Sequence, residues 1–229
     1  MPAPWKAILF DAGNTLLFLD HDRMAAAVGA ELGLPLSAAS LAGAADVAAR
    51  AAERAGGPDR DRARAFLEAL FTAAGVPPER MPEVAGCLQR LHAECHLWGK
   101  VAPGTREALR RLREAGFRLG VVSNSDGRVE EALVAAGLRD QFEVVVDSAL
   151  AGVEKPDPRI FYAALDALGV APAEALYVGD LYEVDVVGAR AAGMEAVLLG
   201  PPVTDAGRTC RSVSSIENLV NDLLRDPAE

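Results

Sequence analysis

Four short polar motifs, each following or bordering an apolar run, constrain the fold of this 229-residue chain most strongly. Asp11, Ser123 and Asp180 each come directly after an apolar stretch, and Lys155 lies next to a proline between the last two. In an open α/β sheet, ligands bind outside the carboxyl ends of the parallel strands. The sequence therefore predicts that these side chains, although distant along the chain, meet in one cleft.

The pattern from Val101 onward predicts strands that alternate with helices. Continuous apolar runs indicate strands that are buried on both faces, and such strands are typical of a parallel sheet covered by helices. We expect strands at 5–10, 117–123, 143–147, 175–178 and 196–199, and helices at 103–115, 128–136, 158–168, 184–192 and 215–224. The fold class is therefore α/β, with a Rossmann-like parallel sheet as its core.

The segment after the first strand has a different pattern, with Ala, Leu, Arg and Glu at helical spacing. Glycine- and proline-containing breaks divide it into four expected helices at 20–33, 38–55, 60–74 and 79–97. Ser37 and Asp59 are candidate N-caps. We expect residues 1–17 and 99–229 to form the core, and residues 18–98 to form an inserted all-helical cap.

Composition excludes some classes of function. The net charge of −10 disfavours nonspecific binding of nucleic acid, which depends on Lys and Arg to neutralise phosphates. The sequence contains no apolar run of about 20 residues and no recognisable signal peptide, so no membrane association is expected. Three cysteines without CxxC spacing favour a reduced, cytoplasmic setting. A monomer and a homodimer are both compatible with the sequence.

The residue types at the strand ends suit phosphoryl-transfer chemistry. The carboxylate of Asp11 can attack phosphorus, although an aspartate there could equally cap a turn. Thr15 could bond a phosphate oxygen or cap the next element. Ser123, Asn124 and the N–H groups of the following helix could cradle an anion, or serve as ordinary N-caps. The ammonium group of Lys155 could neutralise a phosphoryl group, or be a solvated surface charge.

Asp180 and Asp185 lie five residues apart across an expected strand-to-helix turn. Mg²⁺ prefers oxygen ligands and usually takes one or two carboxylates together with waters and phosphate. Asp180 is the better candidate for direct ligation. Asp185 could act through a water or hold Lys155 by an ion pair, and acids at a helix N-terminus also occur without any metal.

Taken together, the motifs FDAGNTL, VVSNSD, VEKPDPRIF and YVGDLYEVDVVGARAAGM resemble those of the haloacid dehalogenase superfamily, in particular members with a helical cap inserted after the first strand. The resemblance covers about residues 5–18 and 100–200. It implies that Asp11 is the nucleophile and forms an aspartyl-phosphate. The implied Mg²⁺ ligands are Asp11, the carbonyl of Gly13 and Asp180, with Asp185 nearby, and the implied phosphoryl contacts are Thr15, Ser123, Asn124 and Lys155.

The chain departs from this family at Gly13. Phosphatases of the family usually carry a second aspartate there, which protonates the leaving group and later activates water. A positioned acid or base typically contributes about 10²–10⁴-fold to the rate. The substrate could have a good leaving group, a cap residue could supply the acid, or catalysis could be largely lost while binding is retained.

Two other reactions of the family also proceed without that aspartate. Phosphonate cleavage needs a lysine in the cap, but the lysines here are Lys6, Lys100 and Lys155. Dehalogenases usually have an aromatic residue at the position of Gly13 and need no metal, so the acidic motif disfavours that reaction.

His92 and His96 are candidates for a replacement acid because their pKa is near neutrality. With Cys95 they form an HxxCH pattern on the expected helix 79–97. They could also be a metal-ligand pair or ordinary packing residues. We therefore expect Mg²⁺-dependent hydrolysis of a small phosphorylated metabolite. The alternatives are a weakly active or non-catalytic metabolite-binding protein and a haloacid dehalogenase-type hydrolase.

Overall fold

The computed structural model describes residues 5–201 and 209–225. The chain divides into two compact units, one formed by Met1–Phe18 and Lys100–Glu229 and the other by Leu19–Gly99. We refer to them as the core unit and the helical unit. Where the chain passes between them, β2 (Phe18–Leu19) and β3 (Trp98–Lys100) form a two-stranded sheet.

The core unit is built on a six-stranded sheet in the order β5-β4-β1-β6-β7-β8, in which every neighbouring pair is parallel. Its strands are β1 (Ala7–Phe10), β4 (Arg118–Ser123), β5 (Val144–Asp147), β6 (Ala175–Gly179), β7 (Glu195–Leu199) and β8 (Arg211–Val213). All residues of β1 and β6 are buried, as strands covered on both faces must be. The predicted parallel α/β fold is thus confirmed, although the sequence pattern did not reveal β8.

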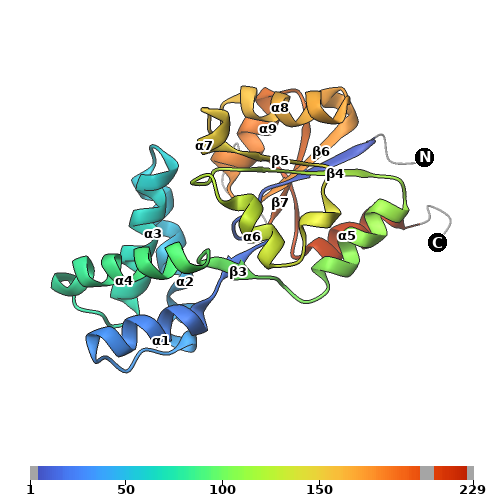
Figure 1. The fold of residues 1–229 in the computed structure, drawn as a ribbon. Coiled ribbons are helices and arrows are strands. Elements are labelled where there is room, and N and C mark those ends of the chain that lie inside the picture. The colour runs from blue at the N-terminus through green and yellow to red at the C-terminus, as the bar shows by residue number, and fades with distance from the viewer. Residues whose placement is uncertain (1–4, 202–208, 226–229) are drawn as a thin grey trace. The chain divides into compact units, whose positions relative to one another are not determined.

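Helices cover both faces of this sheet (Figure 1). One face carries α8 (Pro158–Leu168) and α9 (Val187–Ala191), and the other carries α5 (Thr105–Glu114), α6 (Val129–Ala135) and α10 (Ile216–Leu224). The side chains of α8 and α9 share a continuous apolar cluster with β1 and β6. Short helical turns complete the connections at η2 (Arg139–Gln141), α7 (Ser148–Ala151) and η3 (Pro172–Glu174).

The expected helix 184–192 is not a single α-helix. It begins with a π-helical turn, η4 (Tyr182–Val186), and α9 follows it directly. The side chain of Asp185 bonds back to the main-chain N–H of Leu181 at 2.9 Å, which holds this wide turn against the end of β6. Single π turns of this kind are frequent at functional sites.

The helical unit contains α1 (His21–Leu32), α2 (Ala38–Ala55), α3 (Asp59–Ala73) and α4 (Met81–Glu94), with a short turn, η1 (Pro78–Arg80), before the last. Their apolar faces enclose a separate core that includes Met24, Leu41 and Phe71. The unit therefore has its own hydrophobic centre.

Two cap predictions had different outcomes. Ser37 caps α2 and forms a reciprocal pair with Ser40, as expected from the sequence. The prediction for Asp59 was wrong, because Pro58 is the N-cap and Asp59 is the first helical residue. The Asp59 carboxylate instead bonds Arg62 one turn later at 3.1 Å. Acidic residues in a first turn are favourable without capping the helix.

Helix α4 is shorter than predicted and ends at Glu94, with Cys95 extended. The Arg23 guanidinium from α1 donates hydrogen bonds to the carbonyl groups of Leu91, Cys95 and His96. These carbonyls lie at or just beyond the end of a helix, where donors from outside the helix are favourable. The sequence could not reveal these hydrogen bonds between Arg23 and the end of α4.

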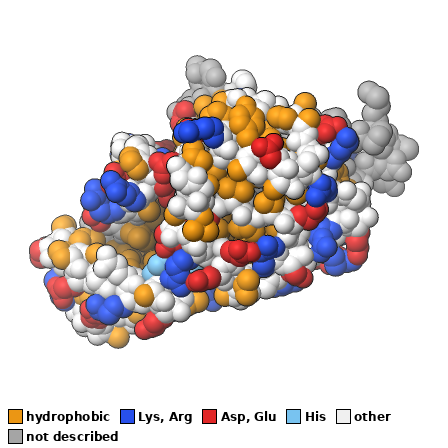
Figure 2. Space-filling view, turned by 45° about the horizontal axis from the view of Figure 1, so that its top comes forward, with side chains coloured by type: hydrophobic (Ala, Val, Ile, Leu, Met, Phe, Trp, Pro, Cys, Tyr) orange, Lys and Arg blue, Asp and Glu red, His pale blue; other side chains and the backbone are white. Residues whose placement is uncertain are grey.

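Acidic and basic side chains are interspersed on the face of the molecule shown in Figure 2. Many arginines are paired on the surface, as with Arg110 and Glu107 or Arg118 and Glu143. Within residues 5–201 and 209–225, no helix combines the length and apolar character needed to cross a bilayer.

Gly188 provides a test of the packing of α9. A Cβ at this position would lie 2.9 Å from the Pro156 Cα and 2.9 Å from the Phe161 ring. We expect Gly188→Ala to lower the free energy of unfolding by about 1–3 kcal/mol through overpacking. Gly43→Ala is the control, because Gly43 has open space around it and alanine favours the helix. Denaturant unfolding that shows equal stability for both variants would contradict this packing.

Candidate active site

The acidic residues predicted to converge do so at the carboxyl edge of the core sheet. Asp11 follows β1, and its N–H continues the pairing by donating to the Val178 carbonyl at 2.8 Å. Asp180 follows β6, and Asp185 lies in η4. One carboxylate oxygen from each of these three residues lies within 4.8 Å of the others. Carboxylates separated by 169 positions in sequence are therefore close enough to share one ion.

The turn after Asp11 is tightly wound around one carbonyl. The Ala12 oxygen accepts the N–H groups of Leu16 and Leu17 at 2.9 and 2.8 Å. Asn14 adopts a φ of 54°, a left-handed conformation that asparagine tolerates better than most residues. Gly13 is half-buried in this turn and forms a bridge with Leu17.

Thr15 is a buried polar side chain in this turn. It is only 1% exposed, and its Oγ1 has no hydrogen-bond partner among the described residues. A buried hydroxyl without a partner is costly and usually marks a site that a ligand or an ion completes. The contact between Thr15 and a phosphate stays a prediction.

Lys155 is the centre of the site and is only 2% exposed. Its Nζ atom donates to three partners, which are Asp11 Oδ1 at 2.6 Å, Asp185 Oδ1 at 2.8 Å and the Tyr177 hydroxyl at 3.0 Å. An ammonium group has three hydrogens, so all three are used. Lys155 is therefore not a solvated surface lysine, and it fixes the orientation of the Asp11 carboxylate.

Sequence reasoning missed Tyr177. It lies within the apolar strand β6 and packs edge-on against Phe161, so it looks like an ordinary core residue. Its hydroxyl donates to the Val122 carbonyl at 3.0 Å and accepts from Lys155. The only signal in the sequence was a tyrosine two residues before the Gly179-Asp180 motif.

The environment changes the acidity of these groups. Burial raises the pKa of Asp11 to about 7, against the Lys155 ammonium, which lowers it. Burial also raises the pKa of Asp180 well above its usual value, and the charges of Asp11 and Asp185 add to that effect. The two carboxylates raise the pKa of Lys155 well above its usual value, against the effect of burial.

The charge balance of the cluster suits a divalent cation. When ionised, Asp11, Asp180 and Asp185 carry three negative charges, and Lys155 supplies one positive charge. Buried charges are stable only when they are paired or bind a metal. Carboxylate oxygens are hard ligands of the kind that Mg²⁺ selects. The residues therefore fit a Mg²⁺ ion.

Both oxygens of the Asp185 carboxylate are engaged. Oδ1 accepts from Lys155, and Oδ2 accepts from the Leu181 N–H. A Cβ on Gly179 would lie 2.7 Å from the Asp185 Cβ, so only glycine allows this approach. Of the two roles considered for Asp185, the geometry favours holding Lys155 over binding a metal through a water.

Ser123 ends β4 and is buried, with its hydroxyl 3.5 Å from the Asn124 carbonyl. The side chain of Asn124 holds the main chain of Lys155 at both polar groups. Its Oδ1 accepts the Lys155 N–H at 2.8 Å, and its Nδ2 donates to the Lys155 carbonyl at 3.1 Å. Asn124 was expected to bind phosphate, but here its side chain positions Lys155.

The anion cradle expected from main-chain N–H groups is also different. The N–H groups of Ser125, Gly127 and Val129 bond to the side chains of Asp147 and Ser148. They are therefore engaged by protein acceptors. Of the two roles left open for these donors, these contacts favour the structural one.

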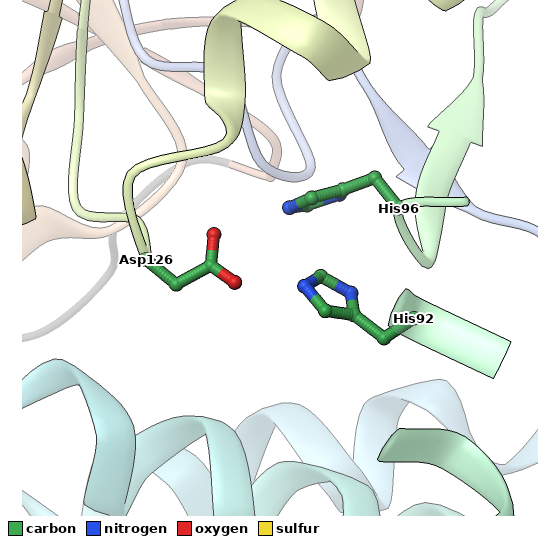
Figure 3. A group of neighbouring side chains, drawn as sticks. All are labelled: His92, His96 and Asp126. Carbon is green, nitrogen blue, oxygen red and sulfur yellow. The ribbon is translucent and has the colours of Figure 1, made fainter. Parts of the chain in front are cut away.

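His92 and His96 belong to the helical unit and lie side by side (Figure 3). Their ring centroids are 4.5 Å apart, although His96 lies beyond the end of α4 and not on its face. Each ring uses Nδ1 to accept a main-chain N–H, from Leu97 at 3.3 Å and from Trp98 at 3.2 Å. Local main-chain contacts therefore fix both rings.

Comparison with known proteins places this geometry in a family. The family model described as haloacid dehalogenase-like hydrolase matches residues 5–193. The bovine (Bos taurus) haloacid dehalogenase-like hydrolase domain-containing protein 3 is 39% identical over 138 residues, which are 60% of this chain and 55% of the relative. The phosphoserine phosphatase of Thermus thermophilus is 43% identical over 142 residues, 62% of this chain and 54% of the relative. The chain thus spans about half the length of these curated relatives.

A solved structure agrees over most of its length. The phosphatase of the same family from Thermococcus onnurineus has a TM-score of 0.58 and 25% identity, covering 95% of this chain and 97% of that one. The match of the family model to most of the sequence and the convergence of Asp11, Lys155 and Asp180 lead to one conclusion. The chain belongs to the haloacid dehalogenase-like hydrolases.

Proposed function

We propose that this protein is a Mg²⁺-dependent phosphatase that hydrolyses a small phosphorylated metabolite through an aspartyl-phosphate on Asp11. The observation that carries the proposal is the position of the Asp11 carboxylate, which lies beside that of Asp180 and is held by Lys155. Relatives named phosphoserine phosphatase and glyceraldehyde 3-phosphate phosphatase support the substrate class.

Different residues of the chain have different roles in the proposed reaction. Asp11 attacks phosphorus, the bond to the leaving oxygen breaks, and water then cleaves the acyl-phosphate to regenerate Asp11. Thr15 and Ser123 hold the phosphoryl oxygens. Lys155, which Asn124 keeps in place, supplies positive charge next to the nucleophile. Asp11, Asp180 and the Gly13 carbonyl would hold the Mg²⁺, with Asp185 next to them. When bound, the ion supplies positive charge that stabilises the phosphoryl oxygens.

The setting follows from the rest of the chain. Cys87, Cys95 and Cys210 are all free thiols, which suits a reducing cytoplasm. The helical unit would act as a cap that excludes water and selects the substrate. We place the partner among small phosphorylated metabolites, with neither nucleic acid nor membrane involved.

The residue at position 13 favours a second candidate function. Glycine cannot protonate a leaving group, so the protein could bind phosphorylated metabolites while turning them over weakly. Turnover of p-nitrophenyl phosphate separates the two, because its leaving group needs little protonation. Saturable phosphate binding without such turnover supports the second function.

Replacement of the nucleophile tests the proposal directly. We expect Asp11→Asn to reduce Mg²⁺-dependent hydrolysis of p-nitrophenyl phosphate by about 10⁴-fold or more, because an amide cannot form the acyl-phosphate. Asp222→Asn is the matched control, since Asp222 forms only surface ion pairs with Arg211 and Arg225. Equal loss in both variants would show that Asp11 has no special role.

Metal binding should depend on pH. The pKa of Asp11 is about 7 in the folded state and near 3.8 when unfolded, so the folded protein binds more protons between these values. Without metal, the stability of the protein therefore falls as the pH rises through this window. Above this window the ionised carboxylates repel one another, and bound Mg²⁺ offsets that repulsion. We expect Mg²⁺ to raise Tm more at about pH 8 than at about pH 5.5. Asp180→Asn should reduce this difference, and an equal rise at both pH values would contradict the assignment.

The missing acid can be restored by mutation. We expect Gly13→Asp to speed hydrolysis of alkyl phosphates by about 10²-fold and to leave p-nitrophenyl phosphate nearly unchanged, because only the poor leaving group needs a proton. Gly13→Asn is the control of equal size without an acid. Steady-state rates that rise equally for both substrates, or for both variants, would show that proton donation is not the missing function.

A further inference from the structure

The connection between β4 and α6 carries Ser123 and Asn124 and is held by the neighbouring strand. Ser123 and Asp147 are register partners at the ends of β4 and β5. Asp147 and Ser148 therefore lie directly beside the start of this connection. Neither has been given a role in the chemistry above.

Asp147 is 5% exposed and accepts hydrogen bonds from three main-chain groups. Both of its oxygens lie 3.0 Å from the Gly127 N–H, Oδ2 lies 3.2 Å from the Val129 N–H, and Oδ1 lies 3.0 Å from the Ala149 N–H. A carboxylate has acceptor sites for all of them. Hydrogen bonds to a charged acceptor are stronger than neutral ones, so this is a firm attachment.

Ser148 holds the same connection at a second point. Its Oγ accepts the Ser125 N–H at 3.0 Å and donates to the Ser125 carbonyl at 3.1 Å. One hydroxyl thus satisfies both main-chain groups of the residue that follows Asn124. The two attachments together fix the connection along most of its length.

Asn124 extends this arrangement to the reactive centre. Its side chain bonds both main-chain groups of Lys155, and the Lys155 ammonium bonds Asp11. Hydrogen bonds, joined by the peptide bond between Asn124 and Ser125, therefore connect the end of β5 to the nucleophile. Each link is a short contact within the core unit.

We propose that Asp147 and Ser148 are positioning residues for phosphoryl binding: they fix the connection that presents the Ser123 hydroxyl and, through Asn124, the Lys155 ammonium. This inference rests on the proposed phosphatase function, in which Ser123 contacts the phosphoryl group and Lys155 orients the nucleophile. Neither Asp147 nor Ser148 touches the substrate. Catalytic geometry must be held within a fraction of an ångström, and a displacement of about 1 Å can cost about 10²-fold in rate.

The test compares Asp147→Asn and Ser148→Ala with Ser148→Thr and with Ser215→Ala. The amide introduced by Asp147→Asn would present an N–H₂ group where an acceptor is needed, and threonine would restore the hydroxyl lost in Ser148→Ala. Ser215 is the matched control, since its hydroxyl caps α10 through the Asn218 N–H at 3.1 Å and is remote in sequence from this connection. Circular dichroism and Tm establish that each variant folds.

Two readouts are taken for each variant, with p-nitrophenyl phosphate as substrate. We expect Asp147→Asn and Ser148→Ala to lower kcat/KM about 10- to 100-fold and to speed amide exchange across residues 124–129. Ser148→Thr should recover most of the activity, and Ser215→Ala should leave both readouts unchanged. If Asp147→Asn does not fold, the positioning role is tested by comparing the two readouts in Ser148→Ala and Ser148→Thr.

The outcomes separate this inference from the proposed function. Faster exchange in Asp147→Asn or Ser148→Ala with unchanged kcat/KM would overturn the positioning role while the phosphatase stands. If the wild-type protein shows no turnover, the proposed function fails. In that case the positioning role is tested by the affinity for inorganic phosphate, measured by calorimetry with Mg²⁺. An affinity about 10-fold weaker in Asp147→Asn than in the wild-type protein supports the positioning role, and equal affinities overturn it.

Discussion

The buried ammonium of Lys155 is the interaction on which the rest of the core unit's functional edge depends. It lies between Asp11 and Asp185, which come from the first strand and from the turn after β6. Removing one partner of a buried ion pair leaves the other charge uncompensated, which is far more costly than losing a surface pair. Asn124, Tyr177 and the Leu181 main chain all support this arrangement.

The same interaction links architecture to chemistry. Parallel strands bring their carboxyl ends to one edge, so a single cation can reach side chains from several strands. The excess negative charge that remains could be neutralised by a divalent ion, as in the proposed function. The raised pKa values of Asp11 and Asp180 show that these carboxylates bind protons more tightly when they are buried together. A metal ion and a proton would compete for the same oxygens.

Much of the fold and part of the site could be predicted from the sequence. Apolar runs at regular intervals indicated the parallel sheet, and the polar residues after them indicated its functional edge. Tyr177 could not be predicted, since a tyrosine in an apolar strand reveals its hydroxyl partner only in three dimensions. The role of Asn124 and the occupation of the loop N–H groups by Asp147 and Ser148 depend on contacts between neighbouring strands. The π-helical turn and the N-cap at Pro58 depend on local backbone geometry, which the spacing of apolar residues in the sequence does not reveal.

The place of β1 in the sheet has a consequence for biosynthesis. This strand is translated before its sheet neighbours β4 and β6, which follow only after the whole helical unit. Pairings between distant segments form late, because closing a long loop costs entropy before any contact repays it. The apolar segment of β1 and the adjacent Asp11 must therefore stay without their sheet partners until translation has passed β6. A chaperone that binds this apolar segment would act during this interval.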